Sequence, residues 1–302
     1  MRPLLKRVRA YPPINWLATT SVRAGARAVP GLLASGERHL PRTGVVRSRL
    51  PNGRELRLEG AGDEPWANAL FWRGWDRFYE PETLPVFFAL ASRAAVTLDI
   101  GANVGIFTLL AGHANPDGRV HAFEPDRRAY RRLVRHVEIN GLANVECDSR
   151  AVIDADGEVT LHSGRAARPD EAVAVSAQTS LSRSHVEAEG ARVDRIDETR
   201  VAAVTIDRFV ESRSVPGVDL VKIDVEGAEA RVLAGMAETI RRDHPAIVCE
   251  VLDRPAGRAI EAVLGPCGYS WTQLTWAGPV PRDRILPLGD GVWPNYLCTF
   301  RG

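Results

Sequence analysis

The chain has 302 residues, of which 45% are hydrophobic and 25% charged, and its formal net charge is +1. This length allows one large domain or one domain with an extension. The small net charge gives no sign of a nucleic-acid partner. The four cysteines are scattered without a C-x-x-C pair, which argues against a zinc site or a disulfide framework and favours a reducing cytoplasm.

The start of the chain is basic but carries no membrane signal. No run approaches the roughly 20 apolar residues that span a bilayer, and the first residues lack the continuous apolar segment of a signal peptide. The basic residues here are Arg2, Lys6, Arg7, Arg9, Arg23 and Arg27. They could contact an anionic membrane surface, although a solvated or partner-packing arm is the simpler interpretation.

The first eighty residues read as an extension rather than as part of a regular repeat. Residues 1–43 look irregular or helical, and Val45–Leu50 and Arg54–Leu58 flank a Pro-Asn-Gly turn, which predicts a β-hairpin. An aromatic cluster follows at Trp66, Phe71, Trp72, Trp75, Phe78 and Tyr79. These side chains could pack the extension onto the core or line an acceptor pocket. A helix is expected over Glu80–Arg93.

From Val96 onward, expected strands and helices alternate. Strands are expected at Val96–Ile100, Arg119–Phe123, Asn144–Cys147 with Ala151–Ile153, Glu158–His162, Asp219–Ile223, Ala246–Val251, Tyr269–Thr275 and Tyr296–Phe300. Helices are expected at Val104–His113, Asp126–Asn140, Thr205–Ser212, Gly227–Gly235 and Arg254–Leu264. Residues 163–200 are polar and pattern-poor, which predicts a loop or lid. This alternation predicts a largely parallel sheet with helices on both faces.

The segment VTLDIGANVG, from Val96 to Gly105, predicts a buried strand that runs into a glycine-rich turn. Such a strand–loop–helix unit brings backbone close to a nucleotide-like ligand. The pattern is D-x-G-x-N-x-G rather than G-x-G-x-x-G. Asp99 would repel a phosphate but suits an ammonium or a hydroxyl donor.

Two further motifs place acids at strand ends. In the segment RVHAFEP (Arg119–Pro125), a strand ends in Glu124, 25 residues after Asp99, where an acid commonly binds ribose hydroxyls. The alternative is an acid that interacts with the dipole of the following helix. The segment DLVKIDVEGAE then delivers Asp224 and Glu226 to the carboxyl edge of the sheet. Lys222, one of only two lysines, shares a strand face with Asp224. It could serve function or form a structural ion pair.

The segments DIGANVG, FEP and VKIDVEGAE, in this order, resemble the motifs of FkbM-family methyltransferases. YEPET (Tyr79–Thr83) and QTSLS (Gln178–Ser182) are similar to further family features. The resemblance implies an enzyme that uses S-adenosylmethionine, usually as an O-methyltransferase. It also implies a doubly wound, mostly parallel, seven-stranded Rossmann-like α/β sheet over residues 76–302, after an extension of residues 1–75.

The resemblance also implies roles for individual residues. Asp99, Gly101, Asn103 and Gly105 would line the methionine part of the cofactor, Glu124 would hold the ribose, and Glu80 would close the methionine end. Asp224 would lie near the methyl group. The adenine contact stays open among Asp148, Ser149 and Arg150, because Arg150-Ala151 stands where such enzymes often carry an acid before an alanine.

The expected reaction is transfer of a methyl group to a hydroxyl of a sugar, secondary metabolite, glycan or lipid. Asp224 or Glu226 is the expected base, with Lys222 orienting either acid, and His185 is a weaker candidate. A metal-assisted reaction on Asp224 and Glu226 lacks a third clustered ligand in the sequence, so no metal is expected. A non-catalytic binding module and an NAD(P)-dependent oxidoreductase are the alternatives. The sequence leaves open whether the protein forms a homo-oligomer.

Overall fold

The computed structural model describes residues 12–26, 32–60, 65–165, 179–181, 195–287 and 294–302. The chain forms two compact units, residues 1–81 and 82–302, whereas the sequence suggested a division after residue 75. No helix among the described residues combines the length and the apolar character needed to cross a membrane.

The first unit combines short helices with the expected hairpin. Its elements are α2 (Pro12–Ala26), α3 (Leu32–His39), β1 (Gly44–Arg49), β2 (Glu55–Gly60) and α4 (Pro65–Arg73). The aromatic cluster supplies much of the core of this unit: Trp72 is 3% exposed, and Trp66 and Tyr79 meet edge to face with ring centroids 4.5 Å apart. These contacts place the cluster within the core of the first unit itself.

The second unit is built on one large sheet. Its strands are β3 (Val96–Ile100), β4 (Arg119–Phe123), β5 (Val145–Asp148), β10 (Leu220–Ile223), β11 (Ala246–Glu250), β12 (Tyr269–Thr275), β13 (Gly278–Arg282) and β14 (Asn295–Phe300), in the spatial order β13-β12-β14-β11-β10-β3-β4-β5. The five strands from β11 to β5 are parallel, and the other three pair antiparallel. All residues of the central β3 and β10 are buried, as expected for strands covered on both faces.

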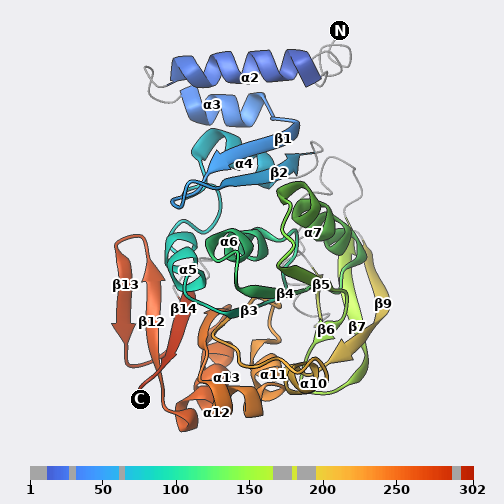
Figure 1. The fold of residues 1–302 in the computed structure, drawn as a ribbon, viewed down its shortest axis with the longest axis vertical. Helices are drawn as coiled ribbons and strands as arrows, with labels where there is room; N and C mark the ends of the chain where they lie inside the picture. Colours follow the sequence, from blue (N-terminus) through green and yellow to red (C-terminus); the bar gives the residue numbers. More distant parts are fainter. Residues whose placement is uncertain (1–11, 27–31, 61–64, 166–178, 182–194, 288–293) are drawn as a thin grey trace. The chain divides into compact units, whose positions relative to one another are not determined.

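Helices cover both faces of this sheet, which confirms the doubly wound α/β fold. They are α5 (Leu84–Ala91), α6 (Ile106–Ala114), α7 (Arg127–Asn140), α10 (Ile206–Ser212), α11 (Glu229–Ala234), α12 (Ala237–Asp243) and α13 (Arg254–Leu264). Helices α6 and α7 lie on one face and α10 to α13 on the other (Figure 1). Local signals set the limits of α7: Asp126 accepts hydrogen bonds from the N–H groups of Arg128 and Ala129, and Gly141 ends the helix with φ 65°.

Two expectations are corrected. The large sheet has eight strands among the described residues rather than seven, because β13 pairs with β12 at its edge. A second sheet contains β6 (Ala151–Val152), β7 (Gly157–Arg165), β8 (Thr179–Ser180) and β9 (Arg195–Val204), in the order β6-β9-β7-β8. Part of the expected 163–200 loop is therefore strand. Strand β9 is polar because much of it is exposed, so the sequence does not show the apolar pattern of a strand. Pairing with β7 satisfies its backbone hydrogen bonds.

Candidate active site

The glycine loop after β3 is fitted tightly against its neighbours. Gly101, Asn103 and Gly105 all have left-handed backbone, with φ of 80°, 49° and 93°. A Cβ atom at Gly101 would lie 1.8 Å from the carbonyl oxygen of Asp224, and one at Gly105 would lie 2.6 Å from Cδ1 of Leu133. Both positions favour glycine for conformation, and Gly101 also requires it for space because the clash there is with backbone.

The N–H groups of this loop are largely used within the protein. Those of Gly101 and Ala102 both donate to the carbonyl of Phe123, and that of Gly105 donates to the carbonyl of Ala102. The N–H of Asn103 donates to the Glu124 carboxylate. A phosphate-binding loop presents such groups to its ligand instead. The loop is therefore unsuited to a pyrophosphate, in agreement with the inference drawn from Asp99.

Glu124 is a buried carboxylate at the end of β4. Its two oxygens accept hydrogen bonds from the N–H groups of Asn103, at 2.8 Å, and Asp126, at 2.7 Å. Burial raises the pKa of Glu124 to about 8, although the two backbone hydrogen bonds act in the opposite direction. Each carboxylate oxygen can accept a second hydrogen bond. Glu124 therefore joins two loops and still has capacity for hydroxyl donors.

Two polar side chains, Asp99 before the loop and Asn103 within it, have contrasting partners. Asp99 is 1% exposed, and its Oδ2 accepts a hydrogen bond from the Thr108 hydroxyl at 2.5 Å. Burial raises the pKa of Asp99 to about 6, opposed by the bond from Thr108 and by the charge of Lys222. The Oδ1 atom of Asn103 is buried and makes no hydrogen bond within the structure. A buried acceptor without a partner is costly, so this oxygen suits a donor from a ligand.

Lys222 and Asp224 form an ion pair at the end of β10. The Lys222 side chain is fully buried, and its Nζ lies 3.1 Å from Oδ2 of Asp224, whose side chain is 19% exposed. The Nζ atom also lies 4.9 Å from the centroid of the Phe107 ring. Lys222 pairs in register with Asp99 on β3. A buried ammonium needs such compensation. Lys222 thus pairs with Asp224, and its charge also acts on Asp99.

The turn after Asp224 is held from two sides. Glu226 has a φ of 54°, and its carbonyl accepts a hydrogen bond from the Ser180 hydroxyl at 2.7 Å. Glu229, only 1% exposed, accepts from the N–H groups of Val225 and Gly227. Burial raises the pKa of Glu229. Glu229 ends the motif DLVKIDVEGAE, but no role was expected for it from the sequence. Its place at the first position of a helix, where an acid is favourable, could have indicated one.

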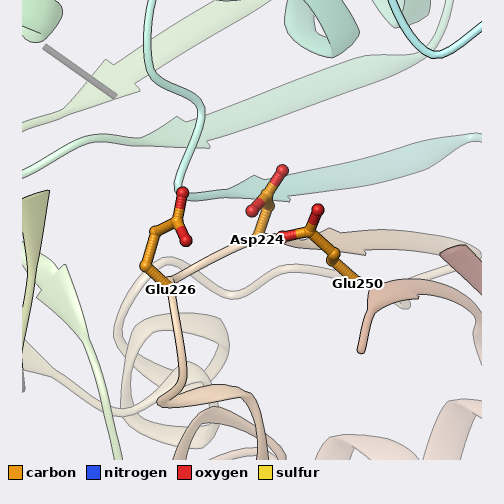
Figure 2. A group of neighbouring side chains, drawn as sticks. All are labelled: Asp224, Glu226 and Glu250. Carbon is orange, nitrogen blue, oxygen red and sulfur yellow. The ribbon is translucent and has the colours of Figure 1, made fainter. Parts of the chain in front are cut away.

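The structure adds a third carboxylate to the expected pair. Single carboxylate oxygens of Asp224, Glu226 and Glu250 all lie within 4.8 Å of one another. Figure 2 shows the three side chains side by side, with Glu250 reaching in from the end of β11. Carboxylates at this spacing repel one another, and oxygen ligands of this kind can hold a divalent cation. The sequence did not single out Glu250.

The end of β5 borders a cavity beside Glu124. Asp148 and Arg150 form a bidentate pair, with contacts of 3.0 and 2.5 Å. Burial favours a raised pKa for Asp148, but the hydrogen bonds from Arg150 hold it below its usual value. A cavity of about 810 Å³ lies between the start of α7 and the β7–β9 ribbon, with Pro125 and Ser149 in its wall.

The predicted site residues are thus distributed unequally. Those on β3, β4 and β10 and their loops gather at the carboxyl edge of the parallel strands, where open α/β sheets bind ligands. Glu80 belongs to the first unit, so its role stays a prediction. His185 lies outside the described residues.

Comparison with known proteins agrees with these motifs. Residues 99–270 match the model of the methyltransferase FkbM domain. The chain is 28% identical over 222 residues to the 31-O-demethyl-FK506 methyltransferase FkbM of Streptomyces tacrolimicus, which covers 69% of this chain and 82% of that protein. It is 27% identical over 198 residues to the methyltransferase sdnD of Sordaria araneosa, which covers 60% and 76% respectively.

A solved structure named methyltransferase FkbM, from Methylobacillus flagellatus, aligns with a TM-score of 0.41 and 13% identity, over 80% of this chain and 56% of that one. The family model matches more than half of the chain and contains its three acidic motifs. This protein belongs to the FkbM methyltransferase family.

Proposed function

We propose that this protein transfers a methyl group from S-adenosylmethionine to a hydroxyl oxygen of a small molecule, glycan or lipid. The observation that carries the proposal is the meeting of the glycine loop, Glu124 and the Lys222–Asp224 pair at one edge of the sheet. Oxygen as the accepting atom is consistent with the Streptomyces relative, whose name specifies a 31-O-demethyl substrate.

The residues present suit this cofactor. Asp99, Gly101, Asn103 and Gly105 would hold its methionine part, with the acceptor Oδ1 of Asn103 and the acid before the loop matching an ammonium group. Glu124 would accept hydrogen bonds from the ribose hydroxyls. We assign the adenine to the cavity beside Pro125 and Ser149.

When bound, S-adenosylmethionine supplies a methyl group on a sulfonium that reacts with an aligned nucleophile. The chain must align the acceptor hydroxyl and take up its proton. We assign proton uptake to Asp224, because Lys222 fixes its Oδ2 atom while the side chain stays partly accessible. Lys222 acts through Asp224 as a positioning residue. Glu226 is the alternative base.

The other functional classes fit the site less well. A dinucleotide-dependent oxidoreductase needs loop N–H groups for the pyrophosphate, whereas four of them are hydrogen-bonded internally. A non-catalytic binding module would retain cofactor affinity but transfer no methyl group. We place the protein in the cytoplasm, a location consistent with four unpaired cysteines.

Calorimetric titration with S-adenosylhomocysteine tests the cofactor assignment. We expect micromolar binding (about 10⁻⁶ M), which Glu124→Ala and Asp99→Asn each weaken at least about tenfold. Asp117→Ala, at an exposed position before β4, is the control and should bind normally. No binding to folded wild-type protein would overturn the proposal. A screen of hydroxyl acceptors with methyl-labelled cofactor separates the enzyme from the binding module, which would label none of them.

A further inference from the structure

The first 36 residues of the chain carry an excess of positive charge. Residues 1–36 contain six basic residues and no aspartate or glutamate, and Glu37 is the first acid. The whole chain nevertheless has a formal net charge of only +1. A local excess of this size attracts anionic surfaces, because same-sign charges within a short segment add rather than cancel.

Helix α2 turns polar side chains inward. Asn15 is 5% exposed and donates to the carbonyl of Pro41 at 2.7 Å. Thr19 is fully buried and accepts a hydrogen bond from Nη1 of Arg42 at 2.6 Å. The contacts of α2 with its own unit at these positions are therefore hydrogen bonds between polar groups.

The large apolar side chains of α2 face outward. Trp16 is 55% exposed and Leu17 is 62% exposed. A helix that packs on a protein core normally buries its apolar side chains and exposes its polar ones. Helix α2 reverses that arrangement between Asn15 and Thr19. Figure 1 shows α2 beside α3 in the first unit.

We propose that this face of α2, defined by Trp16 and Leu17, docks on an anionic lipid bilayer. Tryptophan favours the boundary between lipid headgroups and chains, and leucine can insert below it. Five of the six basic residues of the first 36 positions supply attraction to anionic headgroups, whereas the Arg23 guanidinium lies 4.8 Å from the centroid of the Phe71 ring. A neutral protein groove would make no use of that charge. The attachment is peripheral, and it does not depend on the proposed methyl transfer.

Co-sedimentation of the full chain with lipid vesicles tests this inference. We expect the protein to pellet with vesicles of phosphatidylcholine and phosphatidylserine at low salt. Binding should fall about tenfold or more at high salt or on phosphatidylcholine alone. The double variant Trp16→Ser with Leu17→Ser should lose most of the binding to the anionic vesicles at low salt. Trp276→Ser is the matched control, because Trp276 is 81% exposed in the second unit.

Three outcomes would overturn the inference: no pelleting of the wild-type chain, equal binding to neutral vesicles, or unchanged binding by the double variant. A fourth is a wild-type dimer in sedimentation velocity that the double variant converts to monomer without any lipid binding. That result would make the face a contact between copies. Thermal unfolding of each variant establishes that it is folded. Titration with S-adenosylhomocysteine tests the proposed function separately, and its failure in a folded protein leaves the result of the vesicle experiment valid.

Discussion

Gly101 and Asp224 are in direct contact across two strands. A Cβ atom at Gly101 would lie 1.8 Å from the carbonyl oxygen of Asp224, and the Asp224 N–H donates to the carbonyl of Ile100 at 2.9 Å. The glycine loop and the segment that carries the proposed base are thus in backbone contact. Any side chain at Gly101 must separate them.

Gly101→Ala should therefore damage both stability and binding. We expect the free energy of unfolding to fall by about 3 kcal/mol or more, since rigid backbone must move and φ is positive. Affinity for S-adenosylhomocysteine should fall in parallel. Gly141→Ala is the control, because Gly141 also has a positive φ but nothing within 4 Å of its added Cβ. It should cost only about 1 kcal/mol in urea unfolding. Equal losses for the two variants would contradict the steric explanation.

The affinity for S-adenosylhomocysteine should rise with pH up to about 8. The pKa of Glu124 is raised to about 8 by burial, so the ionised fraction increases as the pH approaches that value. Ionised carboxylates accept stronger hydrogen bonds from ribose hydroxyls than neutral ones do. The dissociation constant should fall by up to about tenfold per pH unit on the acid side of this pKa. Glu124→Gln should remove the slope between about pH 7 and 8, leaving only the contribution of Asp99, whose pKa is about 6, at lower pH. A slope that persists between about pH 7 and 8 in this variant would assign the titration to another group.

Asp224→Asn should abolish most turnover while leaving the cofactor site intact. Removal of a general base typically lowers kcat by about 10² to 10⁴, and the dissociation constant of S-adenosylhomocysteine should stay within about threefold. Asp117→Asn, at an exposed position, serves as control. Full turnover by Asp224→Asn together with its loss in Glu226→Gln would transfer the role to Glu226.

Lys222→Met tests whether the lysine acts through Asp224. The single variant should lower kcat and alter its pH profile, whereas adding it to Asp224→Asn should have little further effect, because the two residues form one unit. Multiplicative losses in the double variant would show that Lys222 acts independently. Urea unfolding of each protein separates this effect from loss of stability.

Chelation distinguishes two uses of the acidic cluster. If Asp224 acts as a base, turnover should be unchanged after treatment with EDTA. Glu250→Gln should then have a smaller effect than Asp224→Asn, because Glu250 only adds negative charge nearby. A loss of turnover that Mg²⁺ restores would instead assign Asp224, Glu226 and Glu250 to a cation.

The sequence by itself determined the elements that local signals define. The buried run Val96–Ile100, the N-cap Asp126 and the terminal Gly141 each act through residues close in the chain, and the structure has them at the expected positions. The same holds for the glycine loop, whose composition identified both its conformation and its unsuitability for phosphate.

Only the tertiary structure decided which distant groups meet. Glu250 joins Asp224 and Glu226 because β11 lies beside β10, and Ser180 reaches Glu226 because β8 adds to the second sheet. Neither neighbour is visible in the sequence, since strand order depends on how helices and loops return the chain to the sheet. The buried carboxyl of Glu124 likewise owes its raised pKa to packing: the sequence supplies the acid, but only the folded environment removes its water.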